Sequence, residues 1–61
     1  MRETYTFEIL VGEKWTTIVN VDSHYVKDGI LYIVTRNINT MEIQPAIMVP
    51  IHAFNWAQVG D

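Results

Sequence analysis

The sequence contains no cysteine and few charged residues. Without cysteine, no disulfide can stabilise the fold and no thiolate can bind zinc. Charged side chains make up 18 % of the chain, against about 25 % in ordinary domains. No apolar run approaches the ~20 residues of a membrane helix, and the start of the chain lacks the apolar block of a signal peptide. We therefore expect a cytoplasmic protein without a membrane segment, and Met1 suggests a complete small reading frame.

The few charges are also dispersed along the chain. Seven acidic and four basic side chains give a net charge of −3 at pH 7. Proteins that bind nucleic acids usually carry a basic patch. The basic residues here, which form no such patch, are Arg2, Lys14, Lys27 and Arg36. We therefore expect no binding of DNA or RNA.

Apolar and polar residues alternate along most of the chain, which is the pattern of β-strands with one buried face. In residues 4–11, for example, Tyr5, Phe7 and Ile9 fall on one face. The strands that this pattern predicts cover residues 4–11, 15–21, 30–36, 41–49 and 55–59. In the second of them, one face would carry Trp15, Thr17, Val19 and Val21.

Two tight turns are predicted in the first half of the chain. Gly12 supplies the permissive backbone of a turn after the first strand. Asp28-Gly29 is a strong signal for a second turn, before the third strand. We expect the residues between the second and third strands, 22–29, to form a loop with a short extended piece at 25–26.

The connections in the second half are marked by asparagine and proline. Residues 37–40 predict a loop whose two asparagines tolerate a positive φ. Pro45 has no N–H group and therefore predicts an edge strand or a bulge. The segment 51–54 is too short for an α-helix and suits a single 3₁₀ turn.

Together these elements predict one all-β domain over residues 1–61. We expect a small, strongly bent antiparallel sheet or a partly open five-stranded barrel, with one 3₁₀ turn before the last strand. The order of elements is similar to that of Src-homology-type barrels, in which the last strand also follows a one-turn helix. The motifs with which those domains bind proline-rich peptides are absent, so the resemblance implies no ligand. An open antiparallel meander completed by another subunit is the alternative.

No group of residues predicts catalysis or a bound metal ion. The spacing of His24 and His52 matches no pattern of metal ligands. Asp22, Ser23 and His24 are adjacent in the chain, whereas the side chains of a catalytic triad must converge. A turn of the Asx type accounts for Asp22 and Ser23. We therefore expect neither an enzyme nor a cofactor.

Three tyrosines, two tryptophans and two phenylalanines are the most informative residues. The apolar residues that we expect in the core include Phe7, Trp15, Ile33, Ile47 and Phe54. Tyrosine, tryptophan and methionine also suit contact surfaces, because their side chains combine an apolar body with a polar group or with flexibility. The candidate binding residues, which we expect on the outer face or in loops, are Tyr25, Tyr32, Arg36, Asn37, Met48 and Trp56.

Hydrophobic residues make up 49 % of the chain, more than so small a core can bury, which favours a homo-oligomer, most simply a dimer. The leading functional hypothesis is a non-enzymatic module that docks on a larger protein and inhibits or recruits it. One form of this hypothesis is an accessory protein of a phage or mobile element that blocks a host enzyme. One alternative is a homo-oligomer that binds a nucleotide-like molecule at the subunit boundary, with Arg36 and Asn37 as a polar lip. A second alternative is a structural subunit that only self-assembles.

Overall fold

The computed structural model describes residues 4–60 and is nearly all β, which confirms the predicted fold class. Met1, Arg2, Glu3 and Asp61 lie outside the described residues. Five strands and one 3₁₀ turn follow one another in the chain. Their bounds are β1 Tyr5–Val11, β2 Lys14–Lys27, β3 Ile30–Thr35, β4 Ile47–Pro50, η1 Ile51–Ala53 and β5 Trp56–Val59. The 3₁₀ turn before the last strand is confirmed.

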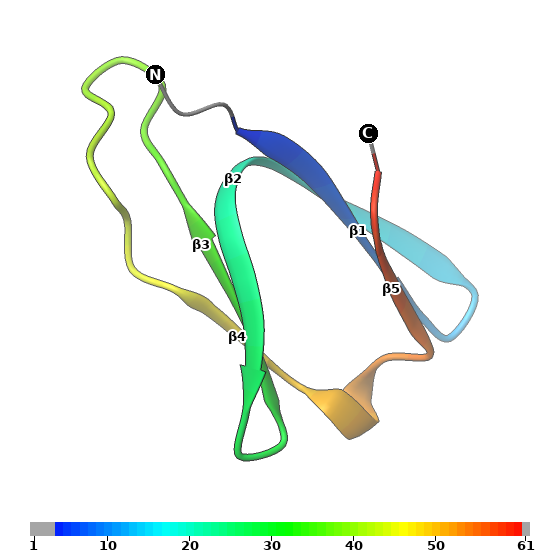
Figure 1. Cartoon of the computed structure of the whole chain (residues 1–61). Coiled ribbons are helices and arrows are strands. Elements are labelled where there is room, and N and C mark those ends of the chain that lie inside the picture. The colour runs from blue at the N-terminus through cyan, green and yellow to red at the C-terminus, as the bar shows by residue number, and fades with distance from the viewer. Residues whose placement is uncertain (1–3, 61) are drawn as a thin grey trace.

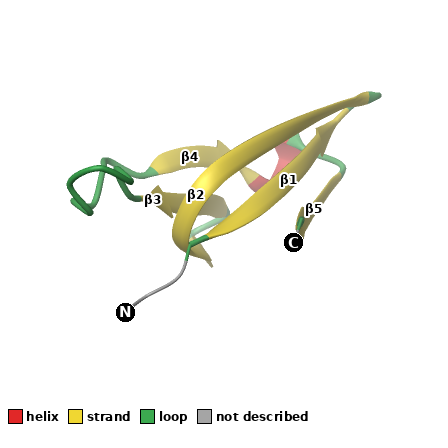
Figure 2. Cartoon of the chain, turned by 90° about the horizontal axis from the view of Figure 1, so that it is seen from above, coloured by secondary structure: helices red, strands yellow, loops and turns green. Residues whose placement is uncertain are grey.

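The strands form one antiparallel sheet in the order β4-β3-β2-β1-β5. The sheet is strongly bent and does not close, so β4 and β5 are its two edges (Figure 1). β2 is 14 residues long and belongs to both halves of the sheet. It pairs with β1 up to Val21 and with β3 from Val21 onward (Figure 2).

Two bulges bend β2 near its middle. The first falls where Tyr5 pairs with Val21 but Phe7 pairs with Ile18, which leaves one extra residue on β2. Asn20 lies in this bulge and has a φ of 59°. The second bulge falls between Val21 and Ser23, opposite the end of β3. Because an extra residue bends the strand and increases its twist, these two sites explain why the sheet folds over.

The prediction of a loop over residues 22–29 is wrong for most of this segment. Residues up to Lys27 continue β2 and pair with β3, from Ser23 opposite Val34 to Lys27 opposite Ile30. The backbone bonds of this ladder outweigh the local turn preference of Asp22 and Ser23. The extended piece predicted at 25–26 is confirmed as part of β2, and the tight turn after it is confirmed as well.

The tight turn between β2 and β3 consists of Asp28 and Gly29, which have φ values of 53° and 75°. Positive φ values at both residues are what a two-residue hairpin turn of type I′ requires. The other predicted tight turn, at Gly12, is also confirmed, with a φ of 64°.

The long connection before β4 replaces much of the fourth strand that we expected over 41–49. β4 begins only at Ile47, and before it a single bridge joins Arg36 to Ile43. Met41 has a φ of 64°, which interrupts an extended chain, and Pro45 cannot donate a backbone hydrogen bond. The positive φ is therefore at Met41 and not at the asparagines of the loop.

The core lies on the inner face of the bent sheet. Its buried residues come from β1, β2 and β3, and they are Phe7, Ile9, Val21, Leu31 and Ile33. β1 and β3 are not neighbours in the sheet, so their side chains meet only because β2 bends between them. The partly buried residues packed against this cluster are Tyr5, Ile18, Val49, Phe54 and Ala57.

Two expected core residues are exposed. Trp15 is 49 % exposed and Ile47 is 40 % exposed. Ile18 pairs with the buried Phe7, so the alternation along β2 puts Trp15 on the outer face. The bulge at Asn20 then returns Val21 to the inner face, and the single face that we expected for residues 15–21 is wrong. Ile47 is exposed because it lies on an edge strand.

Candidate functional site

Three of the predicted binding residues lie in one row across the outer face of β2, β3 and β4. Tyr25 pairs with Tyr32, and Tyr32 pairs with Met48. The two tyrosine rings are stacked, with centroids 5.0 Å apart and planes at 13°. Tyr32 is half-buried, whereas Tyr25 is 48 % and Met48 63 % exposed. The sheet therefore assembles a rigid aromatic pair beside a flexible thioether.

The next row of the same face extends this apolar surface. Ile30 of β3 lies between Lys27 of β2 and Pro50 of β4. We call the outer-face residues of these two rows, apart from Lys27, the outer patch, which consists of Tyr25, Ile30, Tyr32, Met48 and Pro50. Lys27 is the one charged residue of the two rows, and it lies at the hairpin end.

Arg36 and Asn37, also predicted to bind, make contacts within the chain. The Arg36 Nε atom donates a hydrogen bond to Asp22 Oδ1 at 2.8 Å, and Nη1 donates to the Met41 carbonyl at 2.5 Å. The Asn37 side-chain oxygen accepts the N–H groups of Asn39 and Thr40. Both side chains therefore hold the connection between β3 and β4 in shape.

Trp56, the last predicted residue, lies on β5 and not in the outer patch. It pairs with Leu10 of β1 and is 59 % exposed. Its indole N–H donates to Gln58 Oε1 at 3.0 Å, and the Gln58 amide donates to Glu8 Oε1 at 2.9 Å. The ring is therefore oriented by a chain of hydrogen bonds on β5 and β1.

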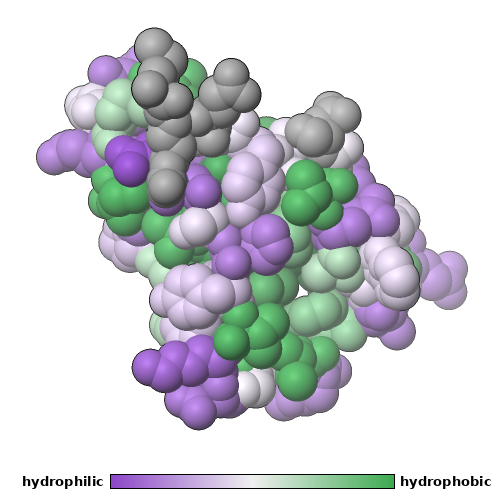
Figure 3. Space-filling view, viewed as in Figure 1, coloured by the Kyte–Doolittle hydropathy of each residue, from purple (hydrophilic) through white to green (hydrophobic). Residues whose placement is uncertain are grey.

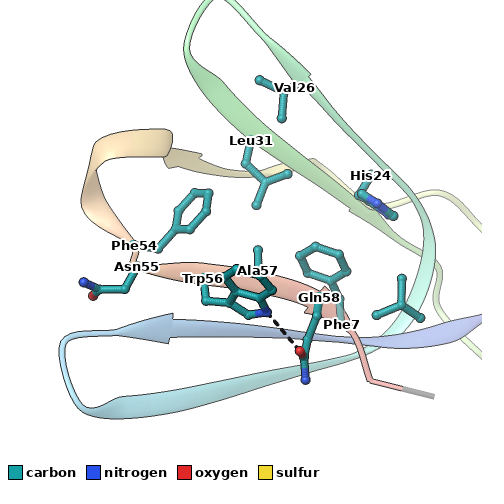
Figure 4. A pocket seen from close by; sticks show the side chains of 10 residues that line it. Phe7, His24, Val26, Leu31, Phe54, Asn55, Trp56, Ala57 and Gln58 are labelled. Carbon is teal, nitrogen blue, oxygen red and sulfur yellow. Dashed lines mark hydrogen bonds between the residues drawn. The ribbon is translucent and has the colours of Figure 1, made fainter.

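A second surface, which the sequence did not predict as a site, is a hollow on the inner side of the sheet. We call this hollow of about 410 Å³ the cleft (Figure 4). It lies between the β2–β3 hairpin and β5, and Figure 3 shows hydrophobic side chains gathered on this face. Its lining residues are Phe7, His24, Val26, Leu31, Phe54, Asn55, Trp56, Ala57, Gln58 and Val59. None of them is an aspartate, glutamate, lysine or arginine.

His24 has a fixed place on the wall of the cleft. Its ring lies 4.6 Å from the ring of Phe7, centroid to centroid, and its Nδ1 atom is 2.5 Å from the Tyr5 hydroxyl. If Tyr5 donates this hydrogen bond, the imidazole proton is on Nε2. The pKa of Tyr5 is raised, first because burial disfavours the phenolate and second because Asp22 is negative. The Tyr5 hydroxyl is therefore held in its protonated form.

The described residues contain few groups suited to chemistry. Within residues 4–60, no three or more histidine, cysteine, aspartate or glutamate side chains gather where they could hold a metal ion. His52 lies on η1, exposed and away from the cleft lining. No helix in this part of the chain is long and apolar enough to cross a membrane. Comparisons with protein-family models, with curated proteins and with solved structures found no match to this chain.

Proposed function

We propose that this chain is a non-enzymatic binding protein that docks on a larger protein through the outer patch and thereby inhibits or recruits it. The observation that carries the proposal is the apolar character of β3 on both of its faces. Leu31 and Ile33 are buried on the inner face, whereas Ile30, Tyr32 and Val34 point outward. A strand of this composition is typical of a position between two covering layers. A partner surface would supply the second layer.

The chemistry of the outer patch supports a protein partner. Tyr25 and Tyr32 already stack on each other, so little side-chain freedom is lost when a partner covers them. Tyrosine is enriched where proteins meet because its ring is apolar and its hydroxyl bonds water or a partner. Met48 can adapt to the shape of a contacting surface, and its full burial would contribute about 1.5–3 kcal/mol.

The proposal is tested with variants that change the patch but not the fold. Met48→Lys places a charge in the patch, and Tyr25→Ser removes half of the aromatic pair. Val19→Lys is the matched control, because Val19 is 57 % exposed on β2, outside both the outer patch and the cleft. Partners captured from lysate of the source cells by tagged wild type would be identified, purified and titrated against each variant.

We expect one dominant partner, whose affinity falls at least tenfold with Met48→Lys and Tyr25→Ser and stays unchanged with Val19→Lys. Light scattering after size exclusion would be measured on the same samples. If no partner is captured and Met48→Lys turns an oligomer into a monomer, the patch serves self-association and the proposal is wrong. Equal losses for all three variants would show a general effect of surface charge or stability and would also contradict it.

A further inference from the structure

The edge strand β5 has backbone N–H and C=O groups that point away from β1, its one neighbour in the sheet. The Gly60 N–H donates to the Thr6 carbonyl at 2.7 Å, next to the paired positions of β1 and β5. In an antiparallel pair, positions that exchange hydrogen bonds alternate with positions that do not. Gln58, opposite Glu8, therefore points its N–H and C=O toward β1. Ala57 and Val59 point theirs to the other side, where no strand of residues 4–60 pairs with β5.

The same two residues line the cleft with their side chains. Ala57 pairs with Ile9 and Val59 pairs with Phe7, and both partners are buried on the inner face. Ala57 and Val59 therefore present free backbone groups along the edge and apolar side chains on the cleft side. Another polypeptide that paired with the free edge of β5 would therefore also contact the cleft.

The opposite side of the cleft is apolar. Val26 and Leu31, from the β2–β3 hairpin, face β5 across it, and Phe54 closes one end (Figure 4). Val26 is 60 % exposed and Val59 is 51 % exposed, so a ligand in the cleft would bury apolar surface on both side chains. Without lysine, arginine, aspartate or glutamate in its lining, the cleft favours an uncharged side chain.

The β5 edge is short, at four residues, but it lacks the residue types that block pairing at an edge strand. Natural proteins block such edges with charged residues or proline, which prevent pairing with another chain. The other edge strand, β4, ends in Pro50 and follows Pro45. Trp56–Val59 contains neither proline nor a charged residue. The edge beside the cleft is therefore the one open to strand addition.

We propose that the cleft binds an extended peptide segment of a partner protein, which pairs as a sixth strand with the free edge of β5. When a peptide adds a strand to a sheet, backbone hydrogen bonds supply the affinity and pockets for alternate side chains supply the specificity. Residues of the peptide opposite Ala57 and Val59 point into the cleft. The residue between them lies opposite Gln58, on the face of Glu8. The recognised pattern is therefore apolar–x–apolar, where x is polar because it lies beside the Gln58 side chain.

This inference does not rest on the proposed function, since the outer patch and the cleft are on opposite faces of the sheet. A partner could use both, or either one alone.

The test selects random seven-residue peptides displayed on phage against the immobilised wild-type chain. The enriched peptides would then be synthesised and their dissociation constants measured by fluorescence polarisation. We expect enriched sequences with large apolar residues two positions apart. N-methylation of the peptide backbone at the residues opposite Ala57 and Val59 should weaken binding at least tenfold, because it removes donors to the strand.

Matched variants of the protein locate the site. Val59→Lys puts a charge in the cleft and should weaken peptide binding at least tenfold. Val11→Lys is the control, since Val11 is 47 % exposed at a strand end and does not line the cleft. Melting temperatures of both variants would show that each is folded. Met48→Lys, in the outer patch, should bind the peptides as wild type does, which separates this site from the proposed docking surface.

Several results would overturn the inference. They are a library that yields no enriched pattern, binding that survives Val59→Lys, and binding that is insensitive to N-methylation. The last would mean that the cleft takes a side chain without strand addition. A dimer that Val59→Lys converts to monomer would identify a second copy of this chain as the occupant of the edge.

Discussion

The Asp22 carboxylate and the Arg36 guanidinium form a salt bridge of 2.8 Å in which the Asp22 side chain is only 6 % exposed. Asp22 lies in the second bulge of β2, and Arg36 opens the connection between β3 and β4. Arg36 also reaches the Met41 carbonyl. The salt bridge thus joins the bent part of the sheet to the long connection.

Removal of Arg36 should destabilise the protein strongly. Arg36→Gln removes the cation that lies 2.8 Å from the Asp22 carboxylate, whose side chain is 6 % exposed, and loss of one partner of a buried pair costs about 3–5 kcal/mol. We expect the lower end of this range, because water reaches the Arg36 side chain, which is 23 % exposed. A domain of this size is stable by only about 3–9 kcal/mol. Urea denaturation would measure the loss.

The control for this prediction is Lys27→Gln, which removes the same charge from an exposed residue at the hairpin end. Its effect should stay within about 0.5 kcal/mol. Equal effects of the two substitutions would mean that the Asp22–Arg36 salt bridge contributes no more than a surface charge.

The raised pKa of Tyr5 predicts a loss of stability at alkaline pH. Because the folded protein favours the protonated phenol, Tyr5 contributes full stability below its ordinary pKa of 10.0. This contribution is lost as the pH rises through the higher pKa of the folded state. Melting temperatures measured from neutral pH to above pH 10 should therefore fall more steeply for wild type than for Tyr5→Phe. Parallel curves would contradict the prediction.

The hairpin that forms one wall of the cleft depends on the conformation of its turn. Gly29 has a φ of 75°, which side chains rarely adopt, and a Cβ added there would meet no atom within 4 Å. Gly29→Ala should therefore cost about 1–2 kcal/mol through backbone strain alone. Asp28→Gly, at a φ of 53°, should cost nothing or stabilise slightly. Urea denaturation of the two variants checks this, and a loss for Asp28→Gly larger than for Gly29→Ala would contradict it.

The fold class followed from the sequence because alternation and turn residues are local signals. The alternation in β1, the strand expected over residues 30–36 and the Asp28-Gly29 turn were all interpreted correctly. The bulges of β2 were not predicted, because Asn20 and Asp22 carry no pattern that distinguishes a bulge from a regular strand. A one-residue bulge exchanges the two faces of every residue before it, which is why Trp15 was assigned to the core.

The candidate site was predictable only where a tight turn sets the register. A two-residue turn at Asp28-Gly29 places Lys27 opposite Ile30, and this register puts Tyr25 opposite Tyr32. Met48 follows an irregular connection, so no local rule could place it in the same row. The cleft joins residues from β1, the β2–β3 hairpin and β5, and its existence depends on how sharply β2 bends. No local pattern in the sequence predicts how sharply this strand bends.

Ile33 and Ile47 allow a final test of where the core ends. The two residues pair with each other across β3 and β4, yet Ile33 is fully buried and Ile47 is 40 % exposed. Replacement of isoleucine by valine removes the same methylene group at either position. Ile33→Val should cost about 0.5–1.5 kcal/mol, because the surrounding core cannot collapse fully around the lost group.

Ile47→Val should have an effect within about 0.5 kcal/mol, as expected for a residue that keeps contact with water on an edge strand. Urea denaturation of both variants and of the double variant measures the difference and any coupling between the neighbours. If Ile47→Val costs as much as Ile33→Val, the inner side of β4 is covered in solution. A second copy of the chain or another partner would then complete the core at that edge, and the sheet would not stand alone.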